Sequence, residues 1–501
     1  MASSQQGEPA AAPASMEKAP PSLSTEERAL RAIEKLKREL SQLKAGEREP
    51  IAIVGTACRL PGDTNSLDDL WALLDSEKDT LSEIPSDRFP LGTRFSTNPD
   101  EDGKTYVKHA SLLSNITAFD PTVFGITPIE AEALDPQQRL LLECVFEALA
   151  DAGVADLRGN FGVFIGVSAI EFALRSRGAE SSVTHLPYLW TGTSQYGVAN
   201  RISYSFDLKG PSIAADGACA SSLVALHLAC QNLRERRIDV AVSGAANVLL
   251  SAEEMVIASK MHALSPDGRC KSFDASGDGY GRGEGAGIVI LKRLSDAVES
   301  GERILGLIRG TATNHGGHAS GFTVPSAAAQ GRLIKEALAR GSTSPYDVSY
   351  VESHGTGTVL GDPIEIEGIR IALVPTHREQ VRVGSIKTNI GHLEAAAGIA
   401  GVLKVLAALQ HRELPASRHF HVPNPQIPWD SIPIKVQTEL TPWPEPSKPL
   451  IAGVSSFGIG GTNAHVIISE APAEPEEKWA AADVEASRKD LVLPLAISAK
   501  V

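Results

Sequence analysis

The stretch 210–227 has the strongest indication of chemistry in the sequence, because Cys219 lies at its centre. Small residues from Gly210 to Ala218 predict a tight turn, and the apolar run after Cys219 predicts a helix that stops at 234–237. A cysteine in the first turn of a helix lies at the positive end of the helix dipole, which favours the nucleophilic thiolate. The alternative is a packed, inert side chain, which is the role of most free cysteines. This stretch alone leaves both open.

Three further segments combine an apolar strand with a polar, glycine-rich loop: 350–358, 385–392 and 453–465. The first two place His354 and His392 directly after a predicted strand. Ligand-binding loops of open α/β sheets gather beyond the carboxyl ends of the strands, so we expect these loops to meet. A thiolate, two imidazoles and a loop that presents backbone N–H groups would suit nucleophilic catalysis.

Other patterns predict less. The segment 277–287 is dense in glycine but lacks the P-loop and strict dinucleotide-binding spacings, which favours tight turns. The histidine pairs at 315–318 and 419–421 have no matching cysteine or carboxylate set, so we expect structural roles rather than metal binding. The G-x-S-x-G motif of serine hydrolases is absent. His465 precedes an apolar run, so we expect it to support its loop.

Strand and helix patterns alternate along the chain, which predicts an α/β fold with a mostly parallel sheet covered on both faces. The predicted strands are 51–55, 161–167, 239–250, 286–292, 350–353, 381–386 and 452–455. The predicted helices are 67–75, 137–151, 328–339 and 364–373, besides the one after Cys219, and 86–108 is expected to be a surface excursion.

The length of 501 residues exceeds one ordinary core, which indicates a large or internally doubled domain. A net charge of −14 argues against nucleic acid as the main ligand. Five cysteines without a C-x-x-C pair or a secretory signal indicate a reducing cytosol. No apolar run approaches the roughly 20 residues of a membrane span. We therefore expect a cytoplasmic protein without a membrane or nucleic-acid partner.

The two ends differ from the middle. Residues 1–22 are rich in Ala, Pro and Ser, which is typical of disorder. A capping box at Ser24–Glu27 opens a predicted helix within 23–46, whose apolar side chains alternate at spacings of four and three. The narrow seam and charged flanks favour a short coiled coil between chains over a helix packed on its own domain. After residue 470 the composition shifts to Ala, Pro and Glu.

Together these motifs resemble the β-ketoacyl synthase (ketosynthase) domains of modular type I polyketide synthases. The resemblance runs from Glu49 to Glu470, and the order of its motifs makes it specific. They are the opening EPIAIVG, DPQQR at 135–139, the cysteine turn, HGTGT at 354–358, NIGH at 389–392 and GTNAH at 461–465. The resemblance implies a thiolase fold for 49–470, in which two similar α/β halves form αβαβα layers, and a homodimer.

The resemblance also implies the chemistry. Cys219 would take an acyl chain as a thioester, and His354 and His392 would assist decarboxylation of a malonyl or methylmalonyl extender. The resulting enolate would attack the acyl group, in a decarboxylative Claisen condensation. The backbone N–H groups of Cys219 and Ile459 would form the oxyanion hole, and Lys387 would tune the charge of the site. The implied substrate-binding residues are Thr356, Thr358, Asn389, Phe457 and Gly460.

The same resemblance suggests partners. No metal or cofactor would be bound directly, because phosphopantetheine is carried by the upstream and extender-loaded acyl carrier proteins. The 23–46 helix resembles a docking helix for an upstream synthase polypeptide, and 471–501 resembles the start of a linker toward an acyltransferase. The family more commonly has Thr at position 217 and Ser at 220, where this chain has Gly217 and Ala220. Both changes remove a hydroxyl near the nucleophile, so the resemblance does not imply which acyl chain is accepted. The alternatives are a chain-transferring ketosynthase, a thiolase-like enzyme acting on coenzyme A thioesters, and a docking platform.

Overall fold

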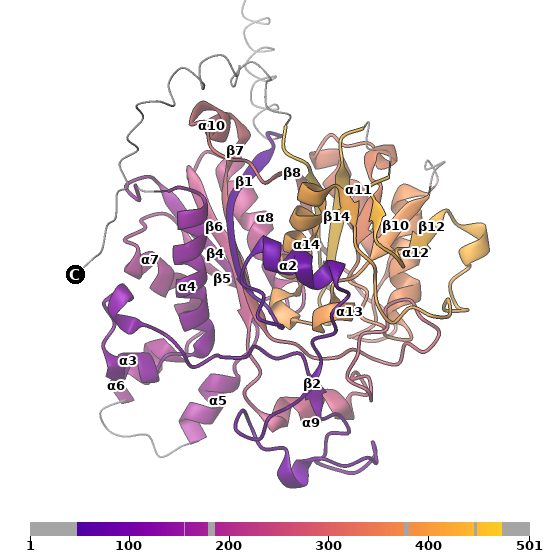
Figure 1. Cartoon of the computed structure of the whole chain (residues 1–501), viewed down its shortest axis with the longest axis horizontal. Helices are drawn as coiled ribbons and strands as arrows, with labels where there is room; N and C mark the ends of the chain where they lie inside the picture. The colour runs from indigo at the N-terminus through magenta and orange to yellow at the C-terminus, as the bar shows by residue number, and fades with distance from the viewer. Residues whose placement is uncertain (1–47, 155, 179–185, 375–379, 445–447, 473–501) are drawn as a thin grey trace, which may run out of the picture. The chain divides into compact units, whose positions relative to one another are not determined.

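The computed structural model describes residues 48–154, 156–178, 186–374, 380–444 and 448–472 (Figure 1). The expected disorder at 1–22, the docking helix at 23–46 and nearly all of 471–501 lie outside these residues. Within them, no helix has the length and apolar character needed to cross a membrane.

A mixed sheet of eleven strands organises the described residues, in the order β12-β10-β9-β14-β15-β8-β1-β7-β6-β4-β5. These strands are β1 (Ile51–Arg59), β4 (Phe161–Gly166), β5 (Ser212–Ala215), β6 (Val240–Asn247), β7 (Gly285–Arg293), β8 (Gly306–His315), β9 (Tyr350–Glu352), β10 (Val381–Gly384), β12 (Ile434–Val436), β14 (Ile451–Phe457) and β15 (Thr462–Ser469). Two small ladders pair β2 (Ser82–Glu83) with β3 (His109–Ala110) and β11 (Glu413–Leu414) with β13 (Thr441–Pro442).

The sheet consists of two halves with the same strand pattern. In the order β1-β7-β6-β4-β5, the first two pairings are antiparallel and the next two are parallel. The order β8-β15-β14-β9-β10 repeats this sequence of directions, and β12 extends it. The halves meet where residues 51–53 of β1 pair with 306–308 of β8. This repeat confirms the two similar halves that the resemblance implied.

The expectation of a mostly parallel sheet was wrong, because β7 and β15 run antiparallel to both of their neighbours. For β15 the reason is the short connection from β14, which spans only residues 458–461. A parallel crossover needs a dozen or more residues, so these two strands form a hairpin.

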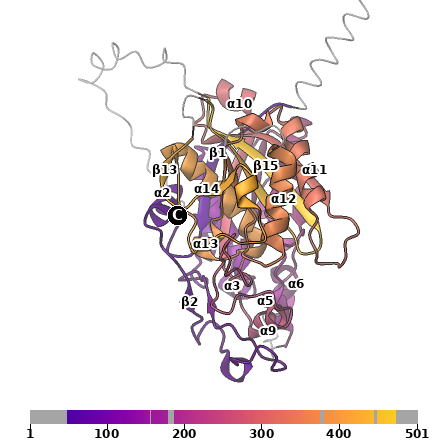
Figure 2. The same ribbon diagram turned by 90° about the vertical axis from the view of Figure 1, so that its right-hand side faces the viewer.

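Helices form the other layers (Figures 1 and 2). The helices are α2 (Leu67–Asp75), α3 (Pro128–Glu132), α4 (Pro136–Asp151), α5 (Glu171–Gly178), α6 (Leu186–Gly192), α7 (Gly197–Ser205), α8 (Ser221–Arg234), α9 (Ala252–Lys260), α10 (Leu294–Glu299), α11 (Ala327–Arg340), α12 (Gly361–Leu373), α13 (Lys387–Ile390) and α14 (Ala397–His411). Short 3-10 turns are η1 (Gly92–Arg94), η2 (Pro121–Phe124), η3 (Pro345–Asp347), η4 (Glu394–Ala396) and η5 (Trp429–Ser431).

The two central helices, α8 and α14, contact each other and lie between the halves of the sheet. On the outer faces, α4 packs on β1 and β7, and α11 packs on β8 and β15. Every residue of α14 from Ala397 to Leu409 is buried, as expected of a helix with layers on both sides. The resulting αβαβα order places the start of α8 at the middle of the molecule's core.

Most predicted elements are present with small shifts at their ends. Helix α2 has the predicted bounds, and α4 begins one residue earlier, at Pro136, capped by the side chain of Asp135. The sequence patterns did not indicate β5, β8 and α14. The first is short, and α14 is apolar on all sides, so it lacks the one-sided periodicity that marks a surface helix.

Candidate active site

Cys219 lies in a tight turn between β5 and α8. Ala218 has a left-handed φ of 52°, and the hydroxyl of Ser221 accepts the Gly217 N–H at 2.9 Å and donates to the Ala218 carbonyl at 2.6 Å. The Asp216 carboxylate accepts the Ala218 N–H at 2.9 Å. These hydrogen bonds pair the backbone polar groups of a tight turn of small residues. They hold Cys219 just before the first turn of α8.

The hairpin β14–β15 fixes Cys219 from the other side. The Ser456 hydroxyl donates to the Cys219 carbonyl oxygen at 2.6 Å. The backbone N–H groups of Ile459 and of Cys219 itself lie on the sulfur side of the turn, and both act to lower the pKa of the Cys219 thiol.

Burial raises the pKa of Cys219 to about 12, and the negative charge of Glu394 acts in the same direction. The positive charge of Lys387 and the two N–H groups oppose this shift without overcoming it. Desolvation of the sulfur therefore works against the thiolate that the helix start was expected to favour. Cys219 is a thiol until a reaction removes its proton.

His354 follows β9 and is held by α12. The two carboxylate oxygens of Glu365 accept the backbone N–H groups of His354 and Gly355, each at 2.7 Å. The Phe457 N–H donates to His354 Nδ1 at 3.5 Å. Because Nδ1 is an acceptor, the proton of the neutral ring is on Nε2.

His392 follows α13, and its ring has the same arrangement as that of His354, with Nδ1 as the acceptor and the proton on Nε2. The Glu394 N–H donates to His392 Nδ1 at 2.9 Å, so Nε2 again carries the proton. Burial and the nearby charge of Lys387 hold the pKa of both His354 and His392 well below the ordinary value. Both rings are therefore neutral donors through Nε2.

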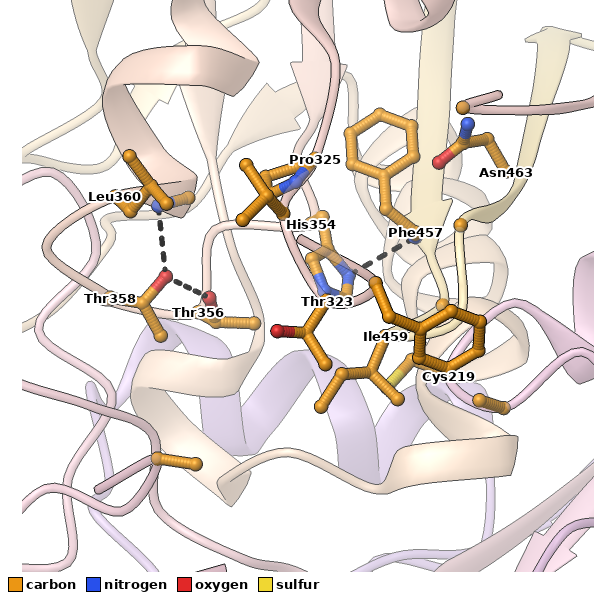
Figure 3. A pocket seen from close by; sticks show the side chains of 18 of the residues that line it. Cys219, Thr323, Pro325, His354, Thr356, Thr358, Leu360, Phe457, Ile459 and Asn463 are labelled. Carbon is orange, nitrogen blue, oxygen red and sulfur yellow. Dashed lines mark hydrogen bonds between the residues drawn. The ribbon is translucent and has the colours of Figure 1, made fainter. Parts of the chain in front are cut away.

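The side chains of Cys219, His354 and His392 meet, and Figure 3 shows the first two of them. The Cys219 sulfur and one nitrogen of each imidazole lie within 4.8 Å of one another, and the ring centroids are 5.3 Å apart. A metal-bound histidine normally donates its second ring N–H to an acceptor, whereas here each Nδ1 faces a backbone donor. This polarity disfavours metal ligation through Nε2 and favours donation to a substrate oxygen.

Lys387 lies in α13 with 4% of its surface exposed. Burial lowers its pKa, while the negative charge of Glu352 works against that effect. Lys387 does not line the cavity beside Cys219, and it acts on Cys219, His354 and His392 through its charge.

A cavity of about 870 Å³ opens onto the three side chains. The predicted residues Thr356, Thr358, Phe457 and Ile459 line it, and a hydrogen bond of 3.2 Å joins the hydroxyls of the two threonines (Figure 3). Asn389 and Gly460 do not line it. The Asn389 amide donates to the Lys78 carbonyl at 3.1 Å, away from the cavity, and so connects two loops instead.

Several residues around the cavity were missed in the sequence. They are Ile257 and Met261 at the end of α9, Phe322, Thr323 and Pro325 before α11, and Arg282 and Glu394 near His392. Only Glu394 carried a usable signal, since it lies two residues after His392. The others come from loops whose approach to the site depends on tertiary packing.

Gly217 and Ala220 do not line the cavity. A Cβ on Gly217 would lie 3.2 Å from Thr462 Cγ2 and 3.4 Å from Val224 Cγ2. Ala220 is fully buried. Both positions belong to the packing behind the cysteine turn.

Two histidines considered above have structural contacts. His315 Nε2 bonds the Gly460 carbonyl at 2.9 Å, and His315 Nδ1 accepts the Gly317 N–H. His465 is buried in β15, where its Nδ1 bonds the Ser455 hydroxyl at 2.9 Å. His465 therefore supports the hairpin, as expected.

Comparisons with known proteins agree with this geometry. Family models match residues 48–297 (β-ketoacyl synthase, N-terminal domain), 305–421 (β-ketoacyl synthase, C-terminal domain) and 423–499 (ketoacyl-synthetase C-terminal extension). The polyketide synthase PksL of Bacillus subtilis is 44% identical over 462 residues, which is 88% of this chain and 10% of that protein. The polyketide synthase GfsB of Streptomyces halstedii is 44% identical over 430 residues, which is 84% of this chain and 8% of that protein.

Solved structures give the same result at the level of the fold. An oxazolomycin ketosynthase domain from Streptomyces albus has a TM-score of 0.79 at 43% identity, over 85% of this chain and 76% of that chain. The ketosynthase from module 6 of the bacillaene synthase of Bacillus subtilis has a TM-score of 0.79 at 39% identity, over 85% and 73% of the two chains. The chain therefore belongs to the β-ketoacyl synthase family and is a ketosynthase domain of the polyketide synthase type, with a thiolase fold.

Proposed function

We propose that this chain extends an acyl chain by decarboxylative Claisen condensation, with Cys219 as the nucleophile and His354 and His392 as hydrogen-bond donors. The observation that carries the proposal is the meeting of the cysteine sulfur with two neutral imidazoles that present Nε2–H. The chain spans only about a tenth of the length of the two curated relatives described above, so the substrates and partners below are part of the proposal.

The first step is transacylation. The Cys219 sulfur attacks the thioester carbonyl of an acyl group on a carrier protein, and the carrier leaves as a thiolate. The proton lost by the Cys219 thiol neutralises that leaving thiolate. The oxyanion of the tetrahedral intermediate would be bound by the N–H groups of Cys219 and Ile459, and their effect of lowering the pKa of the Cys219 thiol supports this role. Since the resting group is a thiol, loss of its proton is part of this step.

The second step forms the carbon–carbon bond. A malonyl or methylmalonyl thioester on a carrier protein loses carbon dioxide, and the electrons of the broken bond form an enolate. His354 and His392 donate Nε2–H to the enolate oxygen, which is the charge that develops in this transition state. The enolate carbon attacks the Cys219 thioester, the cysteine leaves as thiolate and takes up a proton, and a β-ketoacyl chain remains on the carrier.

The partners are acyl carrier proteins, whose phosphopantetheine arms would enter the cavity past Thr356 and Thr358. The lining supports this role, because the two hydroxyls lie on the cavity wall with His354, where a pantetheine amide could bond to them. No directly bound cofactor is part of the proposal. The free state of all five cysteines supports a reducing, cytoplasmic location.

Two further contacts are proposed. The heptad-like spacing within 23–46 supports docking to an upstream synthase polypeptide. The strand β5 is at the edge of the described sheet, and its Ile213 is 37% exposed, which supports a homodimer formed along this edge.

The test separates the two steps. Acyl loading of the enzyme and mass gain of a malonyl-loaded carrier protein are measured for the wild type, His354→Ala and His392→Ala. We expect each variant to load at close to the wild-type rate. We expect each to condense at about one hundredth of the wild-type rate or below, as when one transition-state donor is removed. A His354→Ala variant that extends chains at the full rate would overturn the assigned role. Wild-type loading without condensation for either extender would favour the chain-transferring alternative.

A further inference from the structure

A buried charged network lies behind His392. The guanidinium of Arg282, which is 4% exposed, donates to Glu394 through Nε at 2.6 Å and through Nη2 at 3.1 Å. Its Nη2 also donates to Glu171 at 3.2 Å. Arg282 and Glu394 both line the cavity that contains Cys219 and His392. The charges are thus adjacent to the reacting groups rather than remote from them.

The backbone around Arg282 holds the backbone of His392. The His392 N–H donates to the Gly281 carbonyl at 2.7 Å, and the Gly283 N–H donates to the His392 carbonyl at 2.9 Å. Arg282 and His392 form an isolated parallel bridge. The position of His392 therefore depends on the segment that carries Arg282.

Glu394 has a left-handed φ of 47°, which is a strained backbone conformation for a residue other than glycine. Such a conformation persists only where the surroundings hold it. The clamp of Arg282 on both carboxylate oxygens of Glu394 supplies that support. The strained backbone directs the Glu394 N–H to His392 Nδ1 at 2.9 Å.

We infer that Arg282 and Glu394 are positioning residues for condensation: their clamp holds the Glu394 N–H on His392 Nδ1, which keeps the His392 proton on Nε2, facing the extender. This inference rests on the proposed function of the site. It assigns a role to two residues that no sequence motif indicated.

Glu171 joins this clamp to the cavity wall. Its Oε2 accepts the N–H groups of Leu250 and Ser251, at 2.5 and 2.6 Å, and Ser251 caps α9. Ile257 and Met261, on or just after α9, line the cavity. The network therefore connects the wall of the cavity to the catalytic imidazole.

The clamp also affects the nucleophile. The charged and titratable groups near Cys219 are Lys387, Arg282, Glu394, His354, His392 and Tyr280. Among them, Glu394 is the negative charge that most disfavours the thiolate. Neutralising Glu394 should therefore make Cys219 more reactive. It should also weaken the clamp that holds the Glu394 N–H on His392 Nδ1. A general loss of structure would instead reduce both activities.

The experiment compares Glu394→Gln with wild type in two assays: alkylation of Cys219 by iodoacetamide, and carbon dioxide release from a malonyl-loaded carrier protein by acyl-loaded enzyme. We expect alkylation at fixed pH to rise about threefold to tenfold, because each pKa unit changes the thiolate fraction about tenfold. We expect carbon dioxide release to fall about tenfold or more, as when the hydrogen-bond partner that orients a functional histidine is removed.

Two other variants complete the design. Arg282→Gln breaks the same clamp but leaves the Glu394 charge uncompensated, so both carbon dioxide release and alkylation should fall. Because a general loss of structure would have the same result, the opposite changes in Glu394→Gln are what decide the inference. Glu253→Gln is the matched control, because this exposed glutamate pairs with Arg94 at 3.1 Å outside the site, and both rates should be unchanged.

The outcomes are distinct. Opposite changes of the two rates in Glu394→Gln support the inference. Wild-type carbon dioxide release in Glu394→Gln, or an equal loss of both rates in that variant, overturns it. Wild-type enzyme that loads but releases no carbon dioxide overturns the proposed function itself, independently of the variants.

Discussion

Cys219 combines a strongly raised pKa with neighbours suited to its acylated state. The groups that oppose the raised pKa, Lys387 and the N–H groups of Ile459 and Cys219, do not make it a thiolate at rest. They become more effective when charge develops on a substrate oxygen. The two imidazoles are neutral because burial and Lys387 disfavour their protonation. At the scale of residues, the resting site consists of a neutral thiol and two neutral imidazoles that can donate hydrogen bonds to a substrate oxygen.

The raised pKa predicts how the reactivity of Cys219 depends on pH. For a thiol that titrates near pH 12, the thiolate fraction rises about tenfold per pH unit at all lower pH values. Alkylation of Cys219 should therefore increase about tenfold per unit between about pH 6 and about pH 9, without a plateau. The rate is measured by peptide mass spectrometry with Cys219→Ala as the blank. A plateau above about pH 7 would show that the thiolate is already formed at neutral pH.

At the scale of elements, the hairpin β14–β15 brings the backbone of Ile459 close to Cys219. Gly458 permits this, because a Cβ there would lie 2.2 Å from the Gly217 carbonyl oxygen, in the turn that carries Cys219. Gly458→Ala should displace the loop and slow acylation of Cys219 by about 100-fold, the typical effect of losing one oxyanion donor. Alkylation by iodoacetamide needs no oxyanion hole and should change by less than about threefold. Equal slowing of both reactions would contradict this assignment of the loop.

The sequence predicted the elements that carry the chemistry better than it predicted what surrounds them. The strand-then-loop pattern located His354, because polar residues after a buried strand lie at its carboxyl end. It also pointed to His392, although the structure inserts the short helix α13 between β10 and that residue. The tautomers of both rings depend on backbone donors, from Phe457 and Glu394, that only the folded chain brings into contact. The raised pKa of Cys219 likewise arises from burial by several elements. The direction of β7 was not encoded in any local pattern.

At the scale of the molecule, the repeated halves place α8 and α14 back to back, so the start of α8 is enclosed on both sides. Strand β5, at the outer edge of the sheet, ends shortly before Cys219 in the sequence. The proposed dimer would therefore pair strands that lead directly into the cysteine turn. Ile213→Glu should disfavour strand pairing between copies, because it places two like charges beside each other at the edge. Sedimentation at micromolar concentration should show a dimer for the wild type and a shift to monomer for the variant. A monomeric wild type would contradict the proposed dimer.

The central claim, that Cys219 holds the growing chain and passes it to a decarboxylated extender, is tested most directly by the intact mass of this chain. The protein is incubated with an acyl thioester, weighed, and weighed again after addition of a malonyl-loaded carrier protein. We expect an acyl mass on Cys219, absent from Cys219→Ala, that disappears as a β-ketoacyl product appears on the carrier. An acyl mass elsewhere, or none with several donors, would contradict the claim.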